Sequence, residues 1–168
     1  MTDSYDEVLF DVVARVESAR SVGKADIGAL LFWKRLRADT PWAMALHNMR
    51  DSDVRVVTGA MYVAANDLAV DVPTAAGQAR QALIGLPGCV SGGALPSALI
   101  LAAAPDRMAI YDKRALKALG ILGIALDTSD GWYRGYMQTV ETVRAEVRGR
   151  GKDWSARDVD KALFQLGK

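Results

Sequence analysis

The feature that most constrains the fold is an apolar segment at residues 94–104, ALPSALILAAA. The segment has almost no polar side chain, and a helix that is apolar on every side must be enclosed by other elements. It is too short to span a bilayer. Pro96 falls in the first turn, where its missing N–H costs no hydrogen bond. The segment therefore predicts a buried central helix, with the remaining elements packed around it.

Most of the remaining chain has the three- and four-residue apolar spacing of amphipathic helices. Start signals support this pattern, such as Thr40 followed by Pro41, and Ser155 with Asp158 as a capping box. No strand pattern extends beyond a short link at residues 107–111. We expect an all-α fold of roughly nine helices in one domain, residues 1–168. The predicted helices cover residues 4–19, 25–37, 41–49, 52–65, 73–84, 94–104, 113–119, 132–148 and 156–166.

The formal net charge is +1, so the chain lacks the overall basic field of many nucleic-acid binders. The charge is nevertheless uneven. Residues 1–21 carry two basic and five acidic groups, a net of −3, whereas residues 144–168 carry seven basic and four acidic groups, a net of +3. This asymmetry permits a nucleic-acid-binding face without requiring one.

The chain has one cysteine, Cys89, and one histidine, His47. An internal disulfide is excluded, and so small a set argues against a zinc or iron–sulfur site. We expect no metal and no cofactor. The N-terminal segment MTDSYDEVLF is acidic and lacks the basic and apolar regions of a signal peptide. We therefore expect a soluble cytoplasmic protein without a membrane partner.

Residues 85–93 hold four glycines and join two predicted helices. Such a density predicts a backbone that adopts positive φ or closely approaches another group. One interpretation is an anion site, because amides of a hairpin and of the following helix N-terminus can bind a phosphate. The other interpretation is a glycine-rich connection between packed helices.

Asp112 precedes Lys113 and Arg114 at the start of a predicted helix. An aspartate in this place is a good N-cap, and the helix dipole favours its ionised form. Lys113 and Arg114 are interpreted either as phosphate contacts or as solvated charges. The same alternatives apply to the basic cluster at residues 34–37, which also suits the dipole at a helix C-terminus.

Together, these motifs resemble the hairpin region of the helix-hairpin-helix DNA glycosylase superfamily. A helix runs into Leu86-Pro87-Gly88, a buried helix follows, and an aspartate begins another helix about two dozen residues later. The resemblance covers residues 74–119 and implies a glycosylase-like bundle around the central helix, with DNA as the partner. It implies that Asp112 is the catalytic carboxylate. The residues implied to bind DNA are Gly85, Gly88, Val90, Gly92, Gly93, Lys113 and Arg114.

The chain also departs from this family. Val90 stands where the family's hairpin has a second glycine, as though two residues were inserted before Gly92 and Gly93. Bifunctional members carry a lysine just past the hairpin, where this chain has Leu95, and no lysine occurs between residues 34 and 113. The resemblance therefore implies a monofunctional DNA N-glycosylase, a hydrolase of DNA repair. The alternatives are an inactive DNA-binding or protein-interaction module on the same fold, and an all-α protein with no nucleic-acid function.

Overall fold

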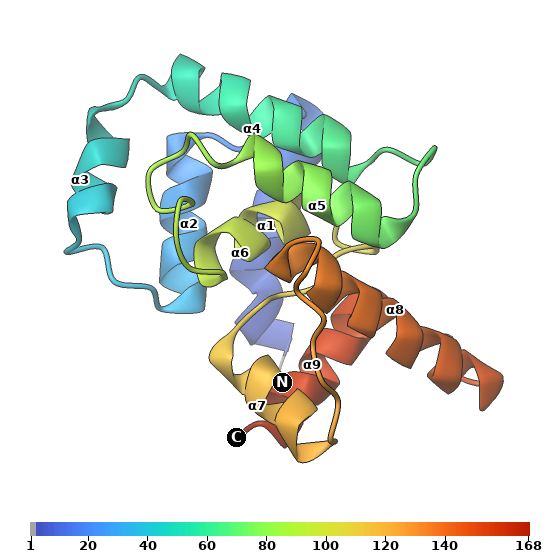
Figure 1. Ribbon diagram of the computed structural model, residues 1–168. Coiled ribbons are helices and arrows are strands. Elements are labelled where there is room, and N and C mark those ends of the chain that lie inside the picture. The colour runs from blue at the N-terminus through green and yellow to red at the C-terminus, as the bar shows by residue number, and fades with distance from the viewer. Residues whose placement is uncertain (1–2) are drawn as a thin grey trace.

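The computed structural model describes residues 3–168, and within that range the chain forms nine helices and no strand (Figure 1). This confirms the all-α prediction. The helices are α1 (Asp3–Ala19), α2 (Lys24–Lys34), α3 (Pro41–Asn48), α4 (Asp51–Ala65), α5 (Val72–Ala82), α6 (Ala94–Ala103), α7 (Lys113–Ile121), α8 (Trp132–Gly149) and α9 (Ala156–Leu166).

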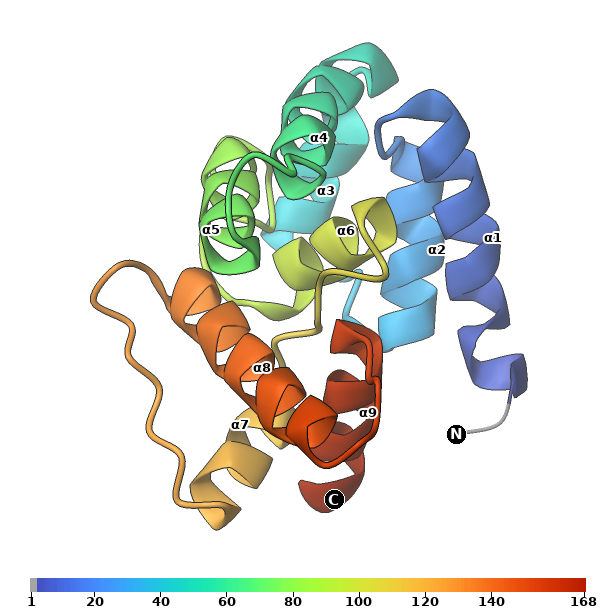
Figure 2. The same cartoon turned by 90° about the vertical axis from the view of Figure 1, so that its right-hand side faces the viewer.

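The central helix is α6, as the sequence predicts. Every residue from Leu95 to Ala103 is buried. Helices α1, α2, α4 and α5 all contact it, and Figures 1 and 2 show it in the middle of the bundle. Helices α7, α8 and α9 form a second group, in which α8 contacts both α5 and α9. The uniformly apolar sequence of α6 thus places it where no face meets water.

Several predicted helix boundaries differ from the observed ones by one to three residues, and three of them have a clear local cause. Helix α2 ends at Lys34 rather than residue 37, because Arg35 has a left-handed conformation with φ of 53°. Helix α4 is preceded by Arg50 as its N-cap, and Asp51 already lies in the first turn. Helix α5 begins at Val72, because the Asp71 carboxylate accepts the amide hydrogen of Thr74. The early end of α2 turns residues 35–37 away from the helix axis.

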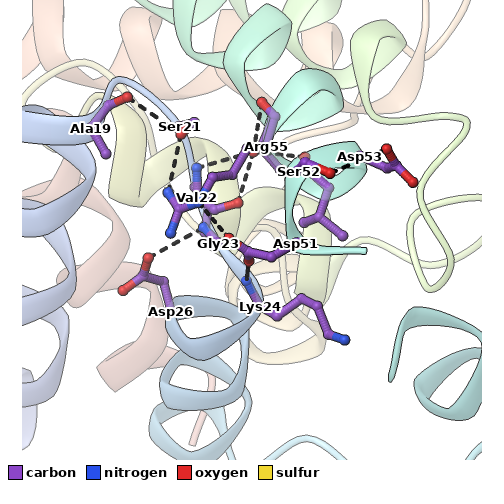
Figure 3. A network of polar contacts seen from close by, with 12 residues as sticks. Ala19, Ser21, Val22, Gly23, Lys24, Asp26, Asp51, Ser52, Asp53 and Arg55 are labelled. Atoms are coloured by element: carbon purple, nitrogen blue, oxygen red, sulfur yellow. Dashed lines mark hydrogen bonds and ion pairs between the residues drawn. The ribbon is translucent and has the colours of Figure 1, made fainter. Parts of the chain in front are cut away.

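The turn between α1 and α2 is attached to α4 by buried polar contacts (Figure 3). The hydroxyl of Thr58 accepts the amide hydrogen of Val22 at 3.0 Å and lies 2.8 Å from the carbonyl oxygen of Val22. Nearby, Asp51 accepts hydrogen bonds from the Lys24 amide and from the Arg55 side chain. These contacts fix the start of α2, and the C-terminal end of α2 in turn reaches the candidate site.

Candidate functional site

One groove of about 1030 Å³ brings together the glycine hairpin, the start of α6, the start of α7 and the C-terminal end of α2. Residues from α1, α3 and the C-terminal segment complete it. The lining residues are Tyr5, Lys34, Arg35, Leu36, Arg37, Thr40, Trp42, Gly88, Ser91, Gly92, Gly93, Ala94, Leu95, Tyr111, Asp112, Lys113, Arg114, Leu116, Phe164, Gln165 and Lys168. The glycine hairpin and Asp112 therefore open onto a common groove.

The hairpin has the unusual backbone that its glycines predict. Gly88 and Gly92 both have φ of +84°. A Cβ on Gly88 would lie 2.5 Å from the Trp42 ring, and a Cβ on Gly93 would overlap the Tyr111 ring. Positive φ and close approach are therefore both present. Among the predicted DNA-binding glycines, Gly88, Gly92 and Gly93 line the groove.

Two hairpin residues of the predicted set lie outside the groove lining. Gly85 is exposed at the end of the α5 segment, and a Cβ there would have no neighbour within 4 Å. Val90 is 68% exposed, and its carbonyl oxygen accepts a hydrogen bond from Arg80 at 3.3 Å. Val90 therefore lies at an exposed position of the hairpin, and Ser91 lines the groove instead.

The N-terminus of α6 faces the groove without a side-chain cap. The first amides of any α-helix have no partner within the helix. Gly93, Ala94 and Leu95, which carry amides of this type at the start of α6, all line the groove. Together with the positive end of the helix dipole, such amides form a site suited to an anion.

Asp112 is the N-cap of α7, as predicted, and it also lines the groove. Its Oδ1 accepts hydrogen bonds from the amides of Arg114 and Ala115, both at 3.0 Å. Its Oδ2 accepts a hydrogen bond from the ammonium of Lys34 at 2.9 Å. Both carboxylate oxygens are therefore held by hydrogen bonds. Oδ1 is bound by the first amides of α7, and Oδ2 is bound by Lys34 at the end of α2, 78 residues earlier in the chain.

The Asp112 carboxyl is ionised in this setting. Its burial opposes ionisation, but the Lys34 ammonium and the amides of Ala115 and Arg114 outweigh that effect. The pKa of Asp112 is consequently below its ordinary value. A carboxylate here can stabilise positive charge on a bound molecule or orient a water molecule.

The segment between α6 and α7, which leads to Asp112, is held in place by two buried tyrosines of α8. The Tyr133 hydroxyl donates to the carbonyl oxygen of Ala109 at 2.9 Å, and the Tyr136 hydroxyl donates to that of Ile110 at 2.8 Å. Burial raises the pKa of both tyrosines, so both hydroxyls remain donors. Both tyrosines belong to the buried core, and nothing in the sequence indicates that they position the acid.

The groove is strongly basic although the whole chain is nearly neutral. Six lining residues are lysine or arginine, and Asp112 is the one acidic residue among those lining it. Lys113 and Arg114 are there as predicted. The other four are Lys34, Arg35, Arg37 and Lys168. Lys34 is paired with Asp112 and Arg37 with Asp39, so the other four cations give the groove a local positive field that the net charge of the chain conceals.

Four aromatic side chains line the same surface, namely Tyr5, Trp42, Tyr111 and Phe164. The guanidinium of Arg114 lies 4.6 Å from the centroid of the Phe164 ring. Trp42 packs on Gly88, and it also lines the groove. No sequence signal identifies Phe164 as a groove residue, because it lies in the last helix, far in sequence from the hairpin and from Asp112.

A buried ion cluster joins α1 to α9 beside the groove. Arg157 pairs with both Asp6 and Asp160, and Lys161 also pairs with Asp6. Burial raises the pKa of Asp160 to about 6, against the opposing effect of Arg157. The cluster holds the first turns of α9 next to α1.

Within residues 3–168, no group of three or more histidine, cysteine, aspartate or glutamate side chains could hold a metal ion. Cys89 is fully buried in the hairpin, and burial raises the pKa of its thiol to about 12. No helix in that same range is both long enough and apolar enough to cross a bilayer. No protein-family model, curated protein or solved structure matches the chain.

Proposed function

We propose that the protein binds DNA through this groove and hydrolyses the base–sugar bond of a flipped nucleotide, with Asp112 as the catalytic carboxylate. The observation that carries the proposal is that the uncapped start of α6, Asp112 and six cationic side chains share one groove. The resemblance of residues 74–119 to helix-hairpin-helix glycosylases supports the same assignment.

DNA backbone fits the charged part of the groove. Phosphates are bound in proteins by lysine and arginine, by free backbone amides and by helix N-termini. The groove offers all three, since Gly92 and Gly93 lead into α6, and Lys113 and Arg114 begin α7. A phosphate near the hairpin would place the adjoining sugar close to Asp112.

A flipped base fits the aromatic part of the groove. Enzymes that act on a base remove it from the stack and hold it against aromatic or apolar side chains. Trp42, Tyr111 and Phe164 line the same groove as Asp112. As the base–sugar bond breaks, positive charge develops on the sugar, and the Asp112 carboxylate stabilises this charge and orients the attacking water.

A second candidate function is DNA binding or protein interaction without catalysis. The geometry of Asp112 favours this alternative, because both of its oxygens already accept hydrogen bonds within the protein. The altered hairpin around Val90 favours it as well.

The test compares the wild-type protein with Asp112→Asn on end-labelled duplexes, each carrying one of a panel of damaged or modified bases. Hot alkali then reveals each site where a base has been removed. We expect alkali-dependent cleavage of at least one duplex by the wild type, and its loss in the variant. If no duplex is cleaved at concentrations where DNA is bound, catalysis is excluded and the second candidate remains. If no salt-dependent retention of DNA occurs, both are excluded.

A further inference from the structure

We propose that Asp160, in the buried ion cluster beside the groove, takes up a proton when the groove binds a phosphate anion, so that DNA affinity depends on pH. The inference rests on the DNA-binding part of the proposed function, because it requires a phosphate in the groove, and it does not depend on catalysis. It assigns a regulatory role to a side chain that does not itself line the groove.

Asp160 shares its cationic partner with a second buried carboxylate. Arg157 donates through Nη1 to Asp160 and through Nη2 to Asp6, the latter at 2.8 Å. The side chains of Asp6 and Asp160 are only 5% and 2% exposed, so water screens neither charge. Asp6 has a second partner, the Lys161 ammonium at 3.2 Å, whereas Arg157 is the one cation paired with Asp160 among residues 3–168. Asp160 is therefore the less compensated of the two carboxylates.

This imbalance makes Asp160 the group that can change its charge near neutral pH. Burial disfavours the ionised form of a carboxyl group. It raises the pKa of Asp160 to about 6, against the opposing effects of Arg157 and Lys34. Asp112 stays ionised in the same pH range, because its pKa is below the ordinary value.

The groups that face Asp160 come from every helix packed around the cluster. The three tyrosines among them remain neutral, because burial raises the pKa of each. The charged and titratable groups are Tyr5 and Asp6 of α1, Lys34 of α2, Asp112 at the start of α7, Tyr133 and Tyr136 of α8, and Arg157 and Lys161 of α9.

The ion cluster meets the groove at the ring of Trp33, which is 4% exposed. The Arg157 guanidinium lies 5.4 Å from the centroid of this ring, and the Lys34 ammonium lies 5.8 Å from it. Lys34 lines the groove and donates to Asp112. Asp160 interacts with both of these groove residues, since Lys34 lowers the pKa of Asp160 and Asp112 raises it.

The charges of the cluster and of the Lys34–Asp112 pair sum to zero when Asp160 is ionised. The three negative groups are Asp6, Asp112 and Asp160, and the three positive groups are Lys34, Arg157 and Lys161. A phosphate in the groove adds negative charge, and the poorly solvated surroundings of Asp160 screen the repulsion weakly. Protonation of Asp160 removes this repulsion. Because linkage is reciprocal, a ligand that raises the pKa of a group binds more tightly when that group is protonated.

The experiment measures duplex affinity from about pH 5.5 to about pH 8, a range that brackets the titration of Asp160. Salt is held constant, because affinity for DNA depends on salt. Fluorescence anisotropy compares the wild type with Asp160→Asn, which keeps the shape of the protonated acid but cannot ionise. His47→Gln is the matched control, since a histidine also titrates in this range and His47 is exposed on α3 outside the groove lining.

Two further measurements use the wild type alone, so the test does not depend on the folding of the variant. Calorimetry in two buffers of different ionisation enthalpy counts the protons taken up on binding. The NMR shift of the Asp160 carboxyl carbon follows the titration of that group directly, with and without the duplex.

The wild type and His47→Gln should bind roughly three- to tenfold more tightly at the acidic end of the range than at the basic end, which corresponds to a rise of about half to one unit in the pKa of Asp160. Both should take up protons on binding. Asp160→Asn should bind across the range with the affinity of the acidic wild type, and its proton uptake should be lost. The carboxyl-carbon titration of Asp160 should move to higher pH when the duplex is bound.

The failure of this inference is distinguishable from the failure of the proposed function. A pH dependence that persists in Asp160→Asn, or that is lost in His47→Gln, overturns the role of Asp160. An Asp160 carboxyl titration that the duplex leaves unchanged has the same consequence. Duplex binding without pH dependence or proton uptake overturns the inference and leaves the proposed DNA binding intact. If DNA is retained at no pH, the proposed function is itself overturned, and this inference with it.

Discussion

Gly88 lies against the indole ring of Trp42, so close that a Cβ on the glycine would be 2.5 Å from ring atom Cε3. This contact joins the hairpin to α3 and makes the shape of the groove depend on two segments 46 residues apart. The hairpin can take this position only if residue 88 has no side chain and can adopt positive φ, here +84°.

Gly88→Ala should therefore destabilise the protein more than Gly92→Ala. Gly92 has the same φ of +84°, but a Cβ there would have no neighbour within 4 Å. The Gly92 variant should lose about 1–2 kcal/mol from the left-handed backbone alone. The Gly88 variant should lose more, because it also displaces Trp42. Urea unfolding measures both, and equal losses would contradict the importance of the Trp42 contact.

Asp112→Asn should lower the free energy of unfolding by about 1–3 kcal/mol at neutral pH, because it leaves the Lys34 ammonium without its acceptor. The Asn side-chain oxygen can still cap α7. Asp39→Asn is the control: it also breaks an aspartate–basic pair, but both partners, Asp39 and Arg37, are exposed. That variant should change stability little.

The same Asp112 variant should show a characteristic pH dependence. The pKa of Asp112 is lowered in the folded protein. Its ionised form therefore stabilises the fold above the ordinary aspartate pKa of about 3.9, and this contribution is lost as the pH falls through the folded value. The stability difference between wild type and variant should shrink in acid. A difference that stays constant from neutral pH to pH 3 would argue against the Lys34–Asp112 pair as its source.

Thr58→Val should lower the free energy of unfolding by about 1–3 kcal/mol, since it leaves the buried Val22 amide and carbonyl without their partner. Thr142→Val is the matched control. Its hydroxyl also bonds a carbonyl one helical turn earlier, that of Gln138, but it lies at the exposed surface of α8. Chemical denaturation measures the free energy of unfolding of both variants. Similar losses in the two variants would show that the turn before α2 is held mainly by apolar packing.

Lys113→Gln should weaken duplex binding at low salt and reduce the slope of log affinity against log salt by about one. Lys117→Gln, on the same helix but outside the groove lining, should leave both quantities unchanged. Titrations at several salt concentrations give the slopes. If the two variants behave alike, the groove is not where DNA binds.

Several features of this protein could be predicted from local sequence because they depend on residues close together in the chain. The burial of α6 follows from the absence of polar side chains in residues 94–104. The Asp112 cap and the Ser155–Asp158 capping box need only the next few amides. Positive φ at Gly88 is permitted by its residue type, although Gly93 in the same hairpin has φ of −111°. Helix ends such as the one at Arg35 could not be predicted in the same way, because a left-handed helix end at an arginine has no local sequence signature.

Tertiary packing alone decided what surrounds Asp112. Lys34 reaches it across 78 residues, and Phe164 and Lys168 arrive from the end of the chain. The spacing of these residues in the sequence does not indicate that they lie close together, because their proximity depends on how α2, α7 and α9 are oriented in the fold. The sequence by itself determined the helices and the capping acid, since these rest on short-range hydrogen bonds and periodicity. The fold determined the basic groove, since that requires side chains from distant helices to converge.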